Sequence, residues 1–86
     1  MAEPKPGDPA SATDHFLDNR GLEPPMPMVR TLEAYERLPC GGTLTIHNDR
    51  VPLYLLPQLA ERGARYDVAE QQDGSAIASI HKPAEP

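Results

Sequence analysis

The chain has 86 residues, 13 of them acidic and eight Lys or Arg, so its formal net charge is −5. This length leaves room for one small core, which excludes a second domain of ordinary size. The acidic balance, without any run of Lys or Arg, argues against nucleic acid as a partner. No stretch resembles a signal peptide or the roughly 20 apolar residues of a membrane span, so we expect a cytoplasmic protein without membrane contact.

Both ends of the chain are rich in proline and poor in apolar residues. Such segments cannot bury enough apolar surface to offset the entropy lost when the backbone is ordered. We therefore predict flexible tails at residues 1–13 and 83–86, on either side of one folded domain at residues 14–82.

The folded part opens with a short apolar stretch, His15–Asp18, which predicts a strand followed by a turn at residues 19–21. The prolines that come next allow a helix to begin, because the first N–H groups of a helix need no internal partner. This helix should end near Leu38, before Pro39 and two glycines. Its apolar face is predicted to consist of Met28, Val29, Leu32 and Tyr35.

Residues 43–47 alternate polar and apolar side chains, which predicts a strand with its apolar residues toward the core. A turn at residues 48–50 leads to a second helix that stops at Gly63. Within this helix, Pro57 either makes a kink or starts the regular part. The apolar residues that mark the second helix are Leu53, Leu55, Leu56, Leu59 and Ala60.

The remaining residues predict a hairpin in which strands 65–70 and 76–82 are joined by a two-residue turn, Asp73–Gly74. The element order is therefore β-α-β-α-β-β. Because two helices cannot cover both faces of so small a sheet, we expect an α+β fold. It would be a two-layer α/β sandwich, a four-stranded mixed sheet with both helices on one face and a polar second face. If the last strand is an exposed edge, two copies could pair through it as a homodimer.

Residues 17–27 read Leu-Asp-Asn-Arg-Gly-Leu-Glu-Pro-Pro-Met-Pro. They resemble the opening of the TusA/SirA-like sulfur-carrier superfamily, whose signature is Leu-Asp, a Gly-Leu pair and Cys-Pro-x-Pro. Together with His-Asn-Asp-Arg-Val-Pro-Leu at residues 47–53, this segment is more similar to a related bacterial family of unknown function, sometimes joined to hemerythrin-like domains. The resemblance covers about residues 16–82 and implies a TusA-like fold, but it transfers no activity.

Alignment on Pro-x-Pro places Pro24 where the sulfur carriers have their cysteine. In those carriers, the resemblance implies a thiolate that the helix N-terminus stabilises. Because proline has neither sulfur nor an N–H group, we expect no sulfur transfer at this position. Cys40 is the only cysteine. It lies beyond the other end of the helix, about 20 Å away at about 1.5 Å per residue, where the helix dipole disfavours a thiolate.

A β-α-β-α order brings the turns after the first two strands to one end of the sheet, beside both helix N-termini. Arginines there could hold an anion, but the prolines remove backbone donors and favour docking of another protein instead. A plainer alternative is that Arg20 pairs with Asp18 or Glu23 while Asp49 caps the second helix. The predicted partner- or anion-binding edge consists of Arg20, Glu23, Pro24, Pro25, Met26, His47, Asn48, Asp49 and Arg50.

Three histidines, His15, His47 and His81, lie in or beside predicted strands and would meet only if those strands are neighbours. Their spacing fits no metal motif, so we expect neither a metal nor a cofactor. No nucleophile, phosphate loop or acid pair is recognisable, so no catalytic residue is predicted. We therefore hypothesise a non-catalytic protein-interaction or accessory module. The alternatives are a sulfur-trafficking protein and a small-ligand or metal-binding domain.

Overall fold

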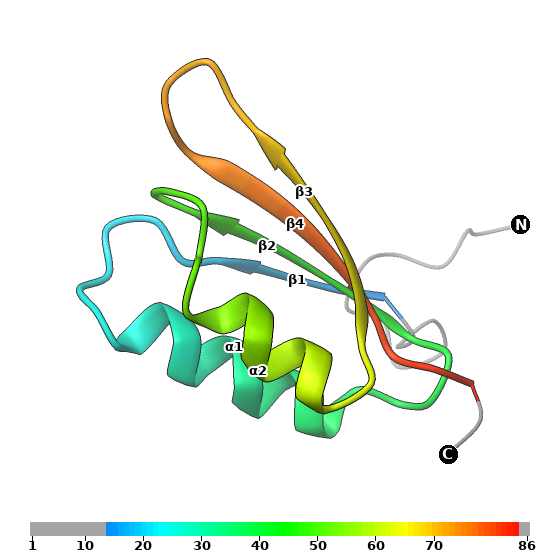
Figure 1. Ribbon diagram of the computed structural model, residues 1–86. Coiled ribbons are helices and arrows are strands. Elements are labelled where there is room, and N and C mark those ends of the chain that lie inside the picture. The colour runs from blue at the N-terminus through cyan, green and yellow to red at the C-terminus, as the bar shows by residue number, and fades with distance from the viewer. Residues whose placement is uncertain (1–13, 85–86) are drawn as a thin grey trace, which may run out of the picture.

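The computed structural model describes residues 14–84, which form a sheet with both helices packed on one of its faces (Figure 1). This confirms the predicted element order and two-layer fold. The tail predicted at residues 1–13, like the last two residues of the chain, lies outside the described residues. The elements are β1 (Asp14–Asp18), α1 (Met26–Arg37), β2 (Thr43–Asn48), α2 (Leu55–Glu61), β3 (Arg65–Glu70) and β4 (Ala76–His81).

The sheet is mixed and its strand order is β1-β2-β4-β3. β1 runs parallel to β2, whereas β4 is antiparallel to both of its neighbours. The last strand is therefore central, and the expectation that it is an exposed edge is wrong. β4 contributes the buried Ala76, Ala78 and Ile80 to the helix-covered face, and small side chains suit a strand flanked on both sides. The edges of the described sheet are β1 and β3.

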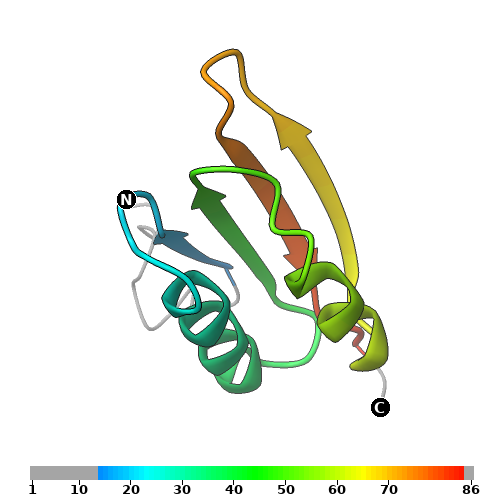
Figure 2. The same cartoon turned by 60° about the vertical axis from the view of Figure 1, so that its left-hand side comes forward.

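The core lies between the sheet and the helices, with α1 beside β2 and α2 beside β3 (Figure 2). Strand alternation places every second side chain of β2 in this core and leaves Thr43, Thr45 and His47 on the other face. That second face is largely polar, as predicted, although Phe16 from β1 is 57% exposed there. The buried core cluster comprises Tyr35, Leu38, Leu44, Ile46, Leu55, Leu59, Ala78 and Ile80.

The predicted inner face of α1 is wrong at one position. Val29 is exposed, and Thr31 is fully buried in its place. The Thr31 hydroxyl donates a hydrogen bond to the carbonyl of Pro27, 2.8 Å away, so its polar group is satisfied inside the domain. Hydrophobic spacing alone does not reveal a threonine whose hydroxyl has a partner.

The predicted start of α2 was two residues too early. Pro57 occupies the first turn of the helix, where its missing N–H costs nothing, so it starts the helix and makes no internal kink. Leu53 consequently precedes the helix and is 70% exposed instead of facing the core. Of the helices within residues 14–84, none is long and apolar enough to cross a membrane.

The β3–β4 connection is longer than the predicted two-residue turn. Gly74, at φ +90°, donates its N–H to the carbonyl of Gln71, and Gln71 donates its N–H to the carbonyl of Ser75. Three residues therefore lie between the closing pair Gln71 and Ser75. A turn of this length ends with a glycine in the left-handed region, which explains why Asp-Gly is present.

The C-terminal end of α1 is held by a side chain that follows β4. The Lys82 ammonium donates to the carbonyl oxygens of Leu38, 2.8 Å away, and Tyr35, 3.2 Å away. It also lies 5.0 Å from the centre of the Tyr35 ring. A cation satisfies carbonyls that a helix end leaves without partners, and it complements the negative end of the helix dipole.

Candidate functional site

The loops that follow β1 and β2 lie at the same end of the sheet, as the chain order predicted (Figure 1). Backbone N–H groups of the first loop are bonded both to the end of β2 and to the loop that follows β2. The Asn19 N–H donates to the carbonyl of His47 at 2.8 Å, and the Gly21 N–H donates to Oδ2 of Asp49 at 2.9 Å. The prediction that Asp49 caps α2 is therefore wrong, because α2 has no side-chain cap. Asp49 instead fixes one loop against the other.

A buried amide network lies beneath these loops. Asn19 is fully buried, and its Nδ2 is 3.1 Å from Oγ1 of Thr31 and 3.0 Å from Oδ1 of Asn48. Sequence reasoning placed Asn19 in a polar turn and missed this role. The sequence does contain a sign of it, because β1 is directly followed by an asparagine and the parallel strand β2 ends in one. The pairing of Asp18 with His47 makes Asn19 and Asn48 the next opposed positions.

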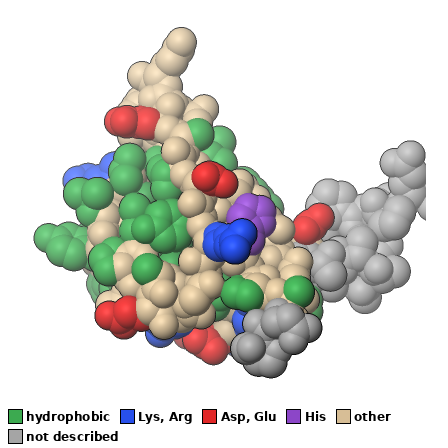
Figure 3. All heavy atoms as spheres, turned by 45° about the vertical axis from the view of Figure 1, so that its right-hand side comes forward, with side chains coloured by type: hydrophobic (Ala, Val, Ile, Leu, Met, Phe, Trp, Pro, Cys, Tyr) green, Lys and Arg blue, Asp and Glu red, His purple; other side chains and the backbone are tan. Residues whose placement is uncertain are grey.

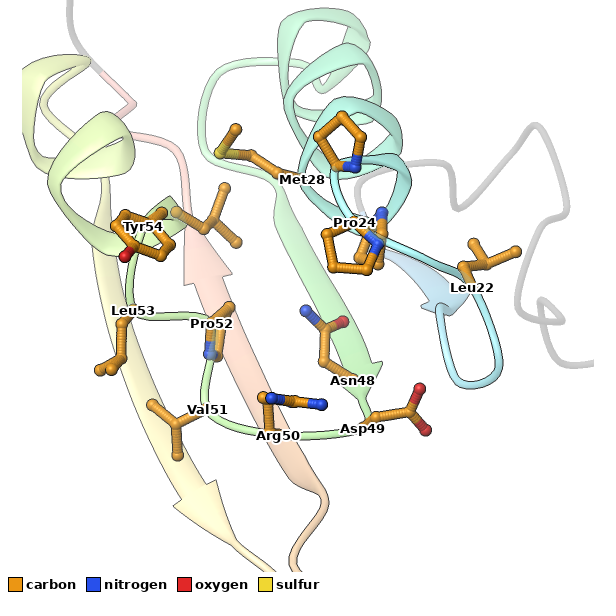
Figure 4. Close-up of a pocket in the computed structure, with 13 residues that line it drawn as sticks. Leu22, Pro24, Met28, Asn48, Asp49, Arg50, Val51, Pro52, Leu53 and Tyr54 are labelled. Atoms are coloured by element: carbon orange, nitrogen blue, oxygen red, sulfur yellow. The ribbon is translucent and has the colours of Figure 1, made fainter.

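Between the two loops lies an open groove with a volume of about 430 Å³. One wall comes from the loop after β1 and the start of α1, and the other from the end of β2 through the first residue of α2 (Figure 4). We call it the proline groove, because four of its lining residues are prolines. Its lining consists of Leu22, Pro24, Pro25, Pro27, Met28 and residues 48–55.

The rim of the proline groove carries exposed apolar side chains. Leu53 is 70% exposed and Tyr54 is 86% exposed. In a space-filling view, hydrophobic side chains gather on one part of the surface, with charged groups mainly around its border (Figure 3). Large apolar side chains that are exposed together on a small domain indicate a contact surface more than a structural need.

Five of the nine residues predicted for the edge line this groove, namely Pro24, Pro25, Asn48, Asp49 and Arg50. The structure therefore brings together members of both predicted loops. Arg50 makes no ion pair with any residue from 14 to 84. The peptide bond between Pro24 and Pro25 is cis.

The other four predicted residues do not line the groove. Arg20 forms a bidentate ion pair with Asp18, at 2.8 and 2.9 Å, as the plainer alternative predicted. Its hydrogen bonds hold the pKa of the Asp18 carboxyl well below its usual range. Glu23 lies in the loop after β1, and Met26 is the first residue of α1. Neither lines the groove. Arg20 is therefore already paired with a carboxylate, and the anion site stays a prediction.

His47 projects from the opposite face of the sheet, away from the proline groove. Strand alternation requires this, because its neighbour Asn48 faces the helices. His47 Nε2 lies 2.9 Å from Oγ of Ser75, whose hydroxyl donates to Asp73 at 2.6 Å. That hydrogen bond lowers the pKa of the Asp73 carboxyl. His47 thus lies at the predicted end of the sheet, but its side chain is on the other face from the groove.

The histidines do not gather into a metal centre. His81 Nδ1 lies 3.1 Å from Oγ1 of Thr43, four residues along β2 from His47. Within residues 14–84, no group of three or more His, Cys, Asp or Glu side chains could hold a metal ion. Cys40 is exposed in the connection after α1, at the opposite end of this helix from the groove. It lies beside Lys82 and Arg62.

Comparison with known proteins places the chain in a family. A model built for uncharacterized conserved proteins, DUF2249, matches residues 16–82, which is most of the chain. The chain belongs to the DUF2249 family. Among curated proteins, no sequence matches it significantly. The description of the family names no activity.

The DUF2249 fold is shared with a solved structure. A SirA-like protein from Desulfitobacterium hafniense superimposes with a TM-score of 0.71 and 22% sequence identity. The match covers 79% of this chain and 96% of the other. This confirms the expected SirA-like fold, and at this identity it shows the fold alone.

Proposed function

We propose that this DUF2249 chain is a non-catalytic protein-interaction or accessory module, and that the proline groove with its rim is its docking surface. The observation that carries the proposal is the pair Leu53 and Tyr54, which lie exposed beside an apolar groove. Burying such side chains against a partner removes apolar surface from water, which is the main favourable term in protein association.

The groove suits a protein better than a small molecule. A ligand site usually encloses most of its ligand, whereas this groove is open and its apolar surface continues outward over Tyr54. Its walls are also stiff, because proline fixes the backbone dihedral φ. A rigid apolar surface loses little conformational entropy on binding.

The test is affinity capture with the full chain immobilised in three forms. A double variant, Leu53→Ser with Tyr54→Ser, removes the rim, and Phe16→Ser removes an exposed apolar side chain from the opposite face as a matched control. All three substituted residues are exposed, so each variant should retain the wild-type circular dichroism spectrum.

We expect proteins identified by mass spectrometry that wild type and Phe16→Ser both retain and that the double variant loses. Equal recovery by the double variant would contradict a docking role for this surface.

The alternative, a sulfur-trafficking role, is suggested by the SirA-like fold, with the sulfur carried either by Cys40 or by a cysteine of a partner protein. The exposed thiol is accessible, but it lies after the C-terminal end of α1 and not at the helix start where the sulfur carriers have their cysteine. Incubation with a persulfide donor and measurement of the intact mass separate the two functions. A mass gain of one sulfur atom on Cys40 would favour trafficking over docking alone.

A further inference from the structure

The proline groove is poor in hydrogen-bond donors. Pro24, Pro25, Pro27 and Pro52 have no N–H group, and the N–H groups of Leu53 and Leu55 are used by carbonyls within their own loop. A partner that docks here therefore meets few backbone donors. The side chains that do offer donors must decide which partners fit.

One such donor is fixed by the amide network. The Thr31 hydroxyl gives its single hydrogen to the Pro27 carbonyl, so toward Asn19 it can only accept. Asn19 must then donate from its Nδ2 both to Thr31 and to Asn48, and Asn48 must accept with its Oδ1. The orientation of the Asn48 amide follows from this chain of donors and acceptors.

The Asn48 amide nitrogen consequently faces the groove. Figure 4 shows it pointing into the space between Pro24 and Pro52. The Asn48 residue is only 5% exposed, and its Nδ2, which is not fully buried, donates no hydrogen bond to residues 14–84. A nearly buried donor without a partner, aimed into an apolar groove, is a position for an acceptor atom of a ligand.

The second donor is Arg50, whose guanidinium lies at the groove two residues further along the chain. Two of the other arginines form ion pairs, Arg20 with Asp18 and Arg62 with Glu36, whereas Arg30, Arg37 and Arg65 form none with residues 14–84 but do not line the groove. Within residues 14–84, Arg50 has no ion pair of its own. The Arg50 guanidinium is thus a cation at the groove of a protein whose net charge is −5, beside Asp49, which also lines the groove and whose carboxylate accepts from the Gly21 N–H.

We propose that the proline groove binds an extended peptide segment of a partner protein in which a bulky aliphatic residue stands next to an acidic residue. The aliphatic side chain packs against the prolines and Met28, a peptide carbonyl accepts from Asn48 Nδ2, and the carboxylate pairs with Arg50. This rests on the proposed docking function and adds to it the chemistry of the partner. The exposed Tyr54 extends the contact beyond a single side chain.

The probes are short capped peptides added at millimolar concentration to the ¹⁵N-labelled full chain. Acetyl-Ala-Leu-Asp-Ala-amide and acetyl-Ala-Asp-Leu-Ala-amide test both residue orders. For each order, replacement of Asp by Asn removes the charge and replacement of Leu by Ala removes the aliphatic side chain. Sodium octanoate tests for a small amphiphilic acid. The readout is the pair of side-chain NH₂ resonances of Asn48, which reports on the donor directly.

We expect a saturable shift of the Asn48 resonances with at least one Leu/Asp peptide and little shift with its Ala counterpart. The variant Arg50→Gln, at an exposed position, should weaken binding of that Asp peptide by about twofold to fivefold, as for an exposed ion pair, and leave the Asn peptide unchanged. Asp49, whose carboxylate holds Gly21, is left intact throughout.

Three results would overturn the inference: no shift with either peptide order, shifts that do not depend on Asp or Arg50, or a shift with octanoate alone. If the peptides fail while capture still depends on Leu53 and Tyr54, the docking function stands and the peptide class is wrong. If the rim variant also captures the same proteins as wild type, both fail.

Discussion

The buried amide network predicts the effect of one nearly isosteric substitution, Thr31→Val. The change removes the hydroxyl that donates to Pro27 and accepts from Asn19, and it retains almost the same side-chain volume. Valine and threonine have similar helix propensities, so α1 itself should be little affected. The buried Asn19 Nδ2 group loses one acceptor, keeps its bond to Asn48 and remains 3.4 Å from the Pro27 carbonyl.

Removing one partner of a buried hydrogen-bonded group costs about 1–3 kcal/mol. Because Asn19 retains a second acceptor, we expect Thr31→Val to lower the free energy of unfolding by about 1–2 kcal/mol. For a domain of this size, that corresponds to a decrease in Tm of roughly 4–15 °C. A loss this large is a substantial part of the stability of a small domain.

The assay is urea unfolding followed by far-ultraviolet circular dichroism, since the chain has no tryptophan. The matched control is Thr45→Val on the open face of β2, where the structure gives the hydroxyl no side-chain hydrogen bond, and it should stay within about 0.5 kcal/mol of wild type. Thr31→Val should also move the Asn48 side-chain amide resonances. Equal stability of the two variants would show that the network does not hold the loops, and the orientation assigned to Asn48 would lose its basis.

Three further predictions concern the contacts around the fold and the groove. Lys82→Met keeps the aliphatic stem but removes the cap of α1, and it should lower the free energy of unfolding by about 1–2 kcal/mol in the same urea assay. Because Arg20 lowers the pKa of Asp18, this pair stabilises the fold above the ordinary carboxyl pKa of about 3.9, and its contribution is lost as the pH falls below it. Asp18→Asn should therefore reduce the change of Tm between neutral and acidic pH, and an unchanged acid profile would refute this. Asp49→Ala should increase the amide exchange rate of Gly21, measured by NMR, because that N–H loses its acceptor.

The element order and layering could be predicted because they depend on short-range signals. Strand alternation at residues 43–47 and the Gly63 stop each act within a few residues of where they are read. The order of the strands in the sheet was harder to predict, because it depends on which strand of the β3–β4 hairpin pairs with β2, and these residues are far apart in the sequence. β4 lies between β2 and β3, and the burial of Ala76 and Ala78 on it is recognisable only once the sheet is assembled.

The candidate site could be predicted as a location but not as a set of side chains. Parallel pairing of β1 with β2 placed Pro24 and Asn48 at one end of the sheet, as the chain order required. Alternation along β2 then sent His47 to the other face, which a list of adjacent residues does not reveal. Asn19 was missed because an asparagine after a strand reads as a turn residue, and only its neighbours make it a buried one.

The unsatisfied oxygen of Asn19 connects the energetics of the fold with the function of the groove. Asn19 Oδ1 is buried and has no hydrogen-bond partner within residues 14–84, a cost of about 1–3 kcal/mol. Two apolar side chains of similar size at positions 19 and 48 would avoid this cost, so stability alone does not account for the pair. What the arrangement achieves is a fixed direction for the Asn48 Nδ2 donor in a groove whose prolines supply none. Under the peptide-binding role proposed above, this cost would be retained because the network orients one donor for recognition and not for packing.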